Sequence, residues 1–320
     1  MLKVGLIGVG GISSAHIPAW EAMPDVELVA LCDVRPEQMK DYESTKHCYT
    51  DAVDMLDNEQ LDILDICLPT YLHADYAVMA MERGIHVLCE KPISLNAEDV
   101  ERVYQTAERM NVRFMVAHVL RFWREYELLV ELVKNNTYGR VLSGWMSRLN
   151  HCPGWSWDDW MKDEKRSGLV PYDLHIHDLD FLIYCFGSPK STTYCRSQRP
   201  EQDYLFATYH YDDFFVNCES SWYAGVIPFS CGFRFQFERA VVVFEGGKLT
   251  AYLDDGTEVC LTEQAESADN VLGLSDMGPY ANEIRYFADC VLSGKNADKV
   301  KPQELETVIA ILDDFKSISS

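Results

Sequence analysis

Short apolar runs alternate with amphipathic segments along the chain up to about residue 120. The apolar runs predict strands at residues 2–8, 27–33, 61–68, 85–89 and 113–117. The segments between them predict helices at residues 11–22, from Pro36 onward, and at residues 72–83 and 96–110. Because these runs are apolar at nearly every position, the strands should be buried on both faces. Strands that alternate with helices in this way predict a parallel sheet with crossover helices.

The pattern changes after about residue 120, where alternation with a period of two comes to dominate. A helix is predicted over residues 123–136, followed by an irregular Trp-rich stretch at 151–168 and a helix over 172–186. Strands are then predicted at residues 204–211, 214–223, 231–238, 240–245, 248–253 and 257–262. Phe233, Phe235 and Phe237 alternate with polar residues, so this sheet should be covered on one face only. Two further helices are predicted at residues 280–292 and 302–318.

These two patterns predict two domains, an α/β domain at residues 1–119 and an α+β domain at residues 120–320. The length of 320 residues agrees with this division at ~150 residues per domain. The boundary is a change of pattern, because no Gly- or Ser-rich spacer separates the two parts. The last two predicted helices can pack back on the first domain.

A glycine-rich turn joins the first predicted strand to the first predicted helix. It reads GVGGIS over residues 8–13. The first glycine permits a tight turn, the second lets the backbone approach a pyrophosphate, and the third position requires a small residue, here Ser13. The N–H groups and the dipole at the start of the following helix attract phosphates. The predicted phosphate-binding residues of a dinucleotide site are therefore Gly8, Gly10, Gly11 and Ile12.

Asp33 ends the second predicted strand, where a carboxylate can accept hydrogen bonds from both hydroxyls of an adenosine ribose. Because a carboxylate repels a 2′-phosphate, Asp33 favours NAD over NADP as the cofactor. Arg35 keeps NADP possible, since its guanidinium can pair with that phosphate or stack on adenine. The alternative interpretation of the motif is a glycine-rich turn that binds no ligand.

Three further segments carry a resemblance to a known family. The sequence CLPTYLH at residues 67–73 follows the third predicted strand, and Glu90-Lys91-Pro92 ends the fourth. Residues 168–187 read GLVPYDLHIHDLDFLIYCFG and contain a D-x-x-x-H pair. Together with the glycine-rich turn, HVLRF at 118–122 and EIRYF at 283–287, these motifs resemble the Gfo/Idh/MocA oxidoreductase family over nearly the whole chain.

The resemblance implies a fold, a cofactor, a substrate class and an assembly. The fold is an α/β Rossmann domain followed by an α+β domain with a large, open, mostly antiparallel sheet. The cofactor is NAD(H) or NADP(H), and the substrate is a sugar, a cyclitol or a related polyol. Members of the family often form a homodimer or homotetramer through the second-domain sheet, and the alternating face over residues 204–262 would suit that use.

The resemblance also implies catalytic roles for Lys91, Asp173 and His177. Lys91 matches the lysine of the family's E-K-P triplet, and a cation past the end of a parallel strand can stabilise a developing alkoxide. Asp173 and His177 are four residues apart, so they share one helix face. His177 is the expected general base for the hydroxyl proton, and Asp173 is expected to bind a neighbouring hydroxyl. The alternatives are a surface lysine before a turn and a packed histidine in a helix.

Further residues are expected around this centre, each with packing as the alternative. Pro69, Thr70 and His73 match the family's loop that borders the nicotinamide, and Glu90 lines the same region. Lys91 also belongs to the expected cofactor contacts. The expected substrate contacts are His118, Arg121, Trp157, Tyr172 and His175.

Trp157 lies between Trp155 and Trp160 on one loop, where an aromatic ring can stack on a sugar or pack against a sheet. Tyr172 or His175 could serve as an additional base. A metal site is not expected, because His175 and His177 are two residues apart and diverge on a helix.

Charge and cysteine content restrict the partners and the compartment. Lys and Arg total 28 and Asp and Glu total 51, which gives a net charge of −23 and argues against nucleic acid or an anionic membrane surface as partner. No run of 18 or more apolar residues predicts a membrane span, and the first apolar run is interpreted as a buried strand rather than a leader. The 11 cysteines include no C-x-x-C pair, which predicts reduced structural thiols in a cytoplasmic protein.

The leading hypothesis is reversible hydride transfer between NAD(P) and a secondary hydroxyl of a sugar or cyclitol. A second hypothesis keeps the cofactor bound while a glycoside is oxidised, undergoes elimination and is reduced again, without net NADH. A third is a non-enzymatic dinucleotide-binding sensor, which the presence of Lys91, Asp173 and His177 disfavours. A metal hydrolase lacks a convincing ligand set, and serine hydrolase chemistry lacks a G-x-S-x-G turn.

Overall fold

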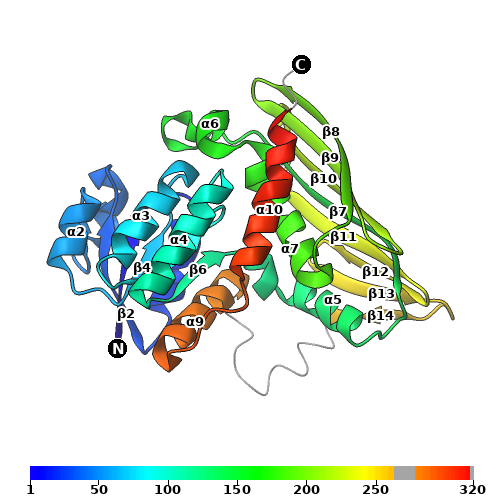
Figure 1. Cartoon of the computed structure of the whole chain (residues 1–320), viewed down its shortest axis with the longest axis horizontal. Coiled ribbons are helices and arrows are strands. Elements are labelled where there is room, and N and C mark those ends of the chain that lie inside the picture. Colours follow the sequence, from blue (N-terminus) through cyan, green and yellow to red (C-terminus); the bar gives the residue numbers. More distant parts are fainter. Residues whose placement is uncertain (263–277, 318–320) are drawn as a thin grey trace. The chain divides into compact units, whose positions relative to one another are not determined.

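The computed structural model describes residues 1–262 and 278–317 of the chain (Figure 1). The described residues form two compact units. The first unit contains residues 1–119 and 278–306, and the second contains residues 120–262 and 307–317.

The first unit is built on a parallel sheet of six strands in the described residues. The order along the sheet is β3-β2-β1-β4-β5-β6, and every neighbouring pair is parallel. The strands are β1 (Leu2–Ile7), β2 (Val26–Cys32), β3 (His47–Tyr49), β4 (Ile63–Ile66), β5 (His86–Glu90) and β6 (Phe114–Ala117). The chain order reverses between β1 and β4, which is the position where open sheets of this kind bind ligands. The predicted parallel sheet is confirmed.

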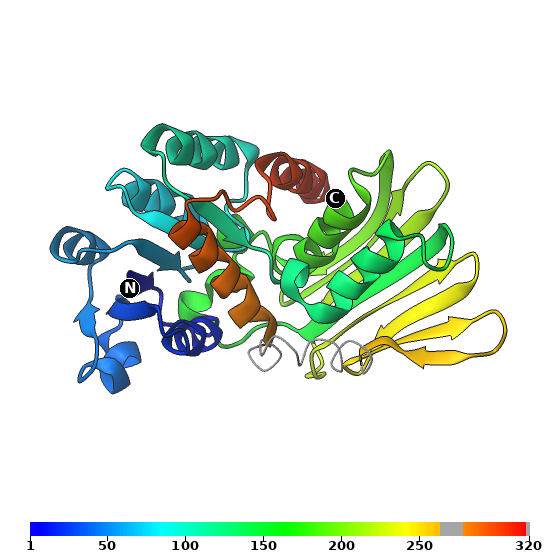
Figure 2. The same ribbon diagram turned by 90° about the horizontal axis from the view of Figure 1, so that it is seen from below.

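Helices connect these strands. They are α1 (Ser13–Glu21), the 3₁₀ segment η1 (Pro36–Tyr42), α2 (Ala52–Asn58), the short η2 (Thr70–Leu72), α3 (His73–Met81) and α4 (Ala97–Met110). Asn96 caps the start of α4 by accepting a hydrogen bond from the Asp99 N–H. A later helix, α9 (Gly278–Ser293), belongs to the same unit and packs against α1 (Figure 2).

The second unit is built on an eight-stranded sheet in the order β14-β13-β12-β11-β7-β10-β9-β8. Among the described strand pairs of this second sheet, β7–β10 is parallel and the others are antiparallel. The strands are β7 (Val141–His151), β8 (Ser191–Arg199), β9 (Gln202–His210), β10 (Phe215–Tyr223), β11 (Ser230–Phe237), β12 (Ala240–Glu245), β13 (Lys248–Leu253) and β14 (Glu258–Cys260). An open, mostly antiparallel second sheet is therefore confirmed.

Helices α5 (Arg124–Lys134) and α7 (Ile176–Phe186) lie against one face of this sheet (Figures 1 and 2). Tyr126 of α5 is buried among three aromatic rings, with centroid distances of 4.8 Å to Phe181, 5.1 Å to Phe233 and 5.8 Å to Phe244. Phe233, Phe235 and Phe237 are all buried, as the alternating pattern predicts for a sheet covered on one face.

Short helical segments and one further helix complete the described chain. They are η3 (Val119–Phe122), η4 (Trp157–Lys162), α6 (Glu164–Ser167), the π-helical turn η5 (Pro171–His175), α10 (Pro302–Asp314) and η6 (Phe315–Ser317). Among the described helices, none has the length and apolar content needed to cross a membrane. All 11 cysteines lie in the described residues, and none forms a disulfide.

Candidate functional site

The glycine-rich turn after β1 has the geometry of a phosphate-binding loop. Gly8 has φ +90°, and a Cβ atom there would lie 2.5 Å from the Cys67 carbonyl oxygen, so only glycine fits. A Cβ at Gly10 would meet no atom within 4 Å, which leaves open space above the turn for a ligand. Ser13 is buried and its hydroxyl donates to the Gly10 carbonyl at 2.7 Å, so it fastens the turn to the start of α1.

Gly11 and Ile12 complete the turn, and Ile12 is the residue that caps α1. The Ser14 hydroxyl donates to the Gly11 carbonyl at 2.6 Å. Backbone N–H groups at the beginning of a helix are natural partners for phosphate oxygens. The residues of this turn therefore fit the pyrophosphate of a dinucleotide.

Asp33, directly after β2, is tied to the same turn. Its Oδ2 accepts the Val9 N–H at 3.0 Å, and its Oδ1 accepts the Arg35 N–H at 2.8 Å. The Arg35 guanidinium also donates to both carboxylate oxygens, at 3.1 and 3.2 Å. Asp33 is thus a buried carboxylate held at the edge of the turn, and a carboxylate is the acceptor that a ribose diol requires.

The loop after β4 and the turn after β5 are joined by His73. Its Nδ1 lies 2.7 Å from the Pro92 carbonyl oxygen and its Nε2 lies 2.6 Å from the Leu68 carbonyl oxygen. The ring is buried, and this burial lowers the pKa of His73. Thr70 is also buried, and Pro69 is partly exposed at the start of η2. The His73 ring therefore lies between two backbone carbonyl groups, while Pro69 retains exposed surface.

Glu90 and Lys91 form the end of β5. Glu90 is buried, and its Oε2 accepts the Lys91 backbone N–H at 3.1 Å. Burial raises the pKa of Glu90, but His16, Lys91 and His73 outweigh it, so the net effect lowers the pKa and favours the carboxylate. Lys91 is partly exposed, as a side chain that meets a ligand must be. His118, just after β6, is buried.

Asp173 and His177, in the second unit, are more exposed to solvent than the residues around them in the sequence. Within residues 171–180 they are the two side chains that are not buried. Trp222 of β10 donates its indole N–H to Asp173 Oδ2 at 3.2 Å. The segment begins with the π-helical turn η5, a feature that is frequent at functional sites. The Asp–His pair therefore faces outward from a buried helix, and Trp222 orients the aspartate.

The structure places three of the expected substrate contacts inside the second unit. The Tyr172 hydroxyl donates to Asp313 at 2.6 Å, and burial together with this bond raises the pKa of Tyr172. His175 is fully buried between the Ser220 and Tyr209 hydroxyls, at 3.0 and 2.6 Å, and burial lowers its pKa to about 3.

The third, Arg121, is fully buried in an ion pair with Asp180. All three side chains are engaged by groups of the unit itself, so we leave them out of the proposed substrate contacts. Trp157 differs, because it is 43% exposed at the start of η4.

Replacing Arg121 with methionine should destabilise the protein by about 3–5 kcal/mol, because Asp180 would remain as a buried, unpaired carboxylate. Urea unfolding followed by circular dichroism measures the loss. Arg102→Met is the matched control, since its partner Asp75 is exposed, its partner Asp99 is partly exposed, and the loss should be at most about 1 kcal/mol. An Arg121→Met protein of normal stability with impaired substrate binding would return Arg121 to the substrate contacts.

The sequence-based predictions missed several residues that support these groups. His16 of α1 lies within 3.0 Å of both Asp65 of β4 and Glu90 of β5. Trp222 supports Asp173 from a strand 49 residues away. The sequence could have indicated His16, because it is a polar residue in the helix that follows the glycine-rich turn. Nothing in the sequence around Trp222 indicated a role for that residue.

The structure brings together the predicted residues in two groups. In the first group, Asp33 contacts the glycine-rich turn through the Val9 N–H, and His73 contacts the E-K-P turn through the Pro92 carbonyl oxygen. The other contains Asp173 and His177, on one side of η5 and α7. The first group belongs to the first unit and the second to the second unit.

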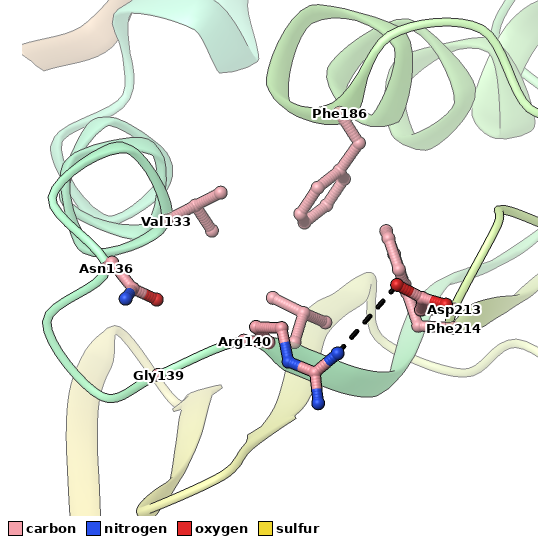
Figure 3. A pocket seen from close by; sticks show the side chains of 8 residues that line it. Val133, Asn136, Gly139, Arg140, Phe186, Asp213 and Phe214 are labelled. Atoms are coloured by element: carbon pink, nitrogen blue, oxygen red, sulfur yellow. Dashed lines mark ion pairs between the residues drawn. The ribbon is translucent and has the colours of Figure 1, made fainter.

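A pocket of about 270 Å³ in the second unit involves none of these residues (Figure 3). Phe186 and Phe214 contribute apolar surface to its wall, and Arg140 points toward Asp213 with a charge separation of 3.8 Å. Arg140 and Asp213 are both well exposed, and Arg140 also pairs with Glu238 at 3.0 Å. The charged side chains of this pocket are therefore exposed and already paired with other charged residues.

Comparison with known proteins assigns a family to both parts of the chain. A family model described as an oxidoreductase family with an NAD-binding Rossmann fold, from the Gfo/Idh/MocA group, matches residues 2–118. A second model, described as the Gfo/Idh/MocA C-terminal domain, matches residues 126–250.

The individual proteins that the chain resembles share about a quarter of its residues or fewer. Glucose-6-phosphate 3-dehydrogenase of Bacillus subtilis (strain 168) is 26% identical over 253 residues, which cover 74% of this chain and 71% of that protein. D-glucoside 3-dehydrogenase of Escherichia coli (strain K12) is 26% identical over 310 residues, which cover 89% and 88%. The fold is similar to that of levoglucosan dehydrogenase in complex with NADH, with a TM-score of 0.84, 20% identity, and coverage of 98% of this chain and 95% of that one.

Proposed function

Because the chain belongs to the Gfo/Idh/MocA family of NAD-binding oxidoreductases, we propose that it oxidises a secondary hydroxyl of a sugar, cyclitol or related polyol to the ketone, or reduces that ketone in the reverse direction. The observation that carries this proposal is the outward-facing Asp173–His177 pair on an otherwise buried segment. Oxidation of a hydroxyl needs both a base and a hydrogen-bonding anchor, and a partly exposed histidine and aspartate on one helix face supply these two groups. The sugar dehydrogenases among the relatives support the substrate class.

The residues of the glycine-rich turn and Asp33 would hold NAD, whose nicotinamide supplies the hydride acceptor when bound. His177 takes the hydroxyl proton as the carbon loses its hydride. Asp173, oriented by Trp222, accepts a hydrogen bond from a neighbouring hydroxyl and fixes the ring. Lys91 donates a hydrogen bond to the reacting oxygen and stabilises the negative charge that develops there.

Asp33→Ala should raise the Kd for NAD by about 10- to 100-fold, because charge-assisted hydrogen bonds to the ribose are lost. The Kd for NADP should rise much less, since the substitution also removes the repulsion of the 2′-phosphate. Isothermal titration with both cofactors measures the ratio. Glu37→Ala, which removes an exposed carboxylate from the nearby 3₁₀ segment η1, should leave both values unchanged. Equal losses for NAD and NADP would contradict the assignment of Asp33 to the ribose.

A substrate screen tests the proposed reaction. The purified protein is incubated with NAD or NADP and a panel of polyols, aldoses and glycosides, and both NADH formation and product mass are followed. NADH that accumulates with one class of polyol or sugar supports the proposal and identifies the substrate class. A cleaved glycoside without net NADH would instead establish the oxidation–elimination–reduction alternative. If no compound of the panel gives either NADH or a changed product mass, both the proposed dehydrogenase reaction and the oxidation–elimination–reduction alternative are contradicted.

We further propose a homodimer or homotetramer formed through the second-unit sheet. Leu142, Phe215 and Tyr252 of that sheet are 38%, 42% and 47% exposed, which is apolar surface that a partner subunit would cover. Light scattering of the purified protein tests the assembly. We also propose a cytoplasmic location, in which the 11 unpaired cysteines would stay reduced.

A further inference from the structure

A cluster of buried charged groups lies beneath the E-K-P turn in the first unit. His16 and Asp65 are fully buried, and Glu90 is nearly so. His16 Nδ1 lies 2.8 Å from Asp65 Oδ2, and its Nε2 lies 3.0 Å from Glu90 Oε1. These three side chains come from α1, β4 and β5, so the imidazole joins the helix after the glycine-rich turn to two central strands.

The partners of His16 determine its charge. Burial lowers the pKa of His16, but the Asp65 carboxylate beside the ring raises it, and the net pKa lies well above the usual value. Asp65 also accepts the Trp20 indole N–H at 2.7 Å, and the Cys67 thiol lies 3.8 Å from its other oxygen. An ionised carboxylate only accepts hydrogen bonds, so both ring nitrogens of His16 act as donors. His16 is therefore an imidazolium held between two carboxylates.

His16, Asp65 and Cys67 also have the donor atoms of a metal site, all within 4.8 Å of one another. Internal hydrogen bonds already occupy His16 and Asp65, and burial raises the pKa of the Cys67 thiol to about 12, so the thiol stays protonated. A cation would have to displace these donors. The cluster is therefore explained by its own ion pairs.

Glu90 transmits this arrangement to Lys91. One carboxylate oxygen of Glu90 faces His16, and the other accepts the Lys91 backbone N–H at 3.1 Å. From the other side, His73 lies 2.7 Å from the Pro92 carbonyl oxygen. The backbone from which Lys91 extends is thus held on both sides by buried histidines.

We propose that His16 is a positioning residue, which through Glu90 fixes the backbone of Lys91 relative to the glycine-rich turn. The inference rests on the proposed role of Lys91 in the reaction. Its physical basis is that α1 begins at the phosphate-binding turn and carries the imidazolium one turn further along, so a single helix supports both groups. A shift of about 1 Å in a group that contacts the reacting atoms can cost a factor of 100 in rate.

His16→Gln should lower kcat by about 10- to 100-fold while the KM values for cofactor and substrate change little. The substrate is the one that the screen identifies, and steady-state kinetics measure the effect. Trp20→Phe is the matched control, because it removes the other N–H donor to Asp65 and leaves the His16–Glu90 contact in place. Its kcat should stay near that of the unmodified protein.

Glu90→Gln breaks the same link from its other end and preserves the packing of α1. If His16 acts through Glu90, the effects of His16→Gln and Glu90→Gln on log kcat should be strongly non-additive in the double variant. Additive effects, or a loss confined to KM, would overturn the inference. Glu90→Gln alone with full kcat would overturn it too, and this result needs only that one variant to fold.

Hydrogen exchange supplies a readout that needs no substrate. The Lys91 amide should exchange faster in His16→Gln and Glu90→Gln than in the unmodified protein, and at the normal rate in Trp20→Phe. Exchange unchanged in His16→Gln would overturn the positioning role. A different result would show that the proposed catalytic role of Lys91 is wrong. In that case Lys91→Ala would retain full turnover, whatever the exchange rate of the Lys91 amide in the His16 and Glu90 variants.

Discussion

Lys91→Ala should lower kcat by about 100- to 1,000-fold, the loss typical when one donor to a developing oxyanion is removed. The hydroxyl oxygen gains negative charge as its proton and the carbon's hydride leave, and the ammonium of Lys91 is the proposed group that stabilises this charge. Glu90 keeps the backbone of Lys91 in place, so the variant should lose the ammonium without moving the turn. Steady-state kinetics with the identified substrate measure kcat, and isothermal titration measures the Kd for NAD, which should change little.

Two controls separate a charge effect from a general effect. Lys40→Ala removes an exposed lysine from the same unit and should leave kcat unchanged. Lys91→Arg keeps a cation but changes its geometry, so it should recover only part of the rate. A Lys91→Ala variant whose Kd for NAD rises in proportion to the loss of kcat would assign Lys91 to cofactor binding, against its proposed catalytic role.

Buried contacts in each unit explain why the segments that carry Lys91 and Asp173 have fixed positions. In the first unit, the imidazolium of His16 contacts the Glu90 carboxylate of the E-K-P turn, and the ring of His73 contacts the Pro92 carbonyl oxygen of the same turn. In the second unit, the indole of Trp222 holds Asp173. Each proposed reacting group is thus a partly exposed side chain on a segment whose neighbours are locked by buried contacts, which is the arrangement that keeps catalytic geometry precise.

The regular elements of the fold were predictable where apolar runs were long. The strand predicted at residues 61–68 is apolar at six of its eight positions and appears as β4, but the three-residue β3, with exposed His47, gave no such signal. β7 and β8 were missed as well. β8 reads STTYCRSQR and is largely exposed, because it lies at an edge of the sheet where its side chains need not be apolar.

The candidate site was predictable only in part, and burial explains the difference. The Asp173–His177 spacing predicts a shared helix face, and the structure shows both side chains partly exposed there. No local pattern distinguishes them from His175, which the fold encloses between Ser220 and Tyr209. These partners lie 45 and 34 residues away, so the distinction depends on how the sheet pairs.

His177→Gln should lower kcat by about 100- to 10,000-fold, because glutamine cannot accept the hydroxyl proton. Glutamine retains a hydrogen-bonding group of similar reach, so substrate should still bind and KM should change less than kcat. The pH profile provides the sharper measurement. The activity of the unmodified protein should fall toward acidic pH as its base takes up a proton, and this acidic limb should disappear from the residual activity of the variant.

The neighbouring histidine cannot produce that limb. Burial lowers the pKa of His175 to about 3, so its ring remains neutral throughout the range in which the assay is run. His210→Gln is the matched control, a partly exposed histidine of the same unit, and it should preserve both kcat and the acidic limb. A His177→Gln variant that keeps full kcat and the same limb would remove His177 from the reaction. A lowered kcat with the limb intact would leave His177 a role in binding or orientation and require a different group as the base.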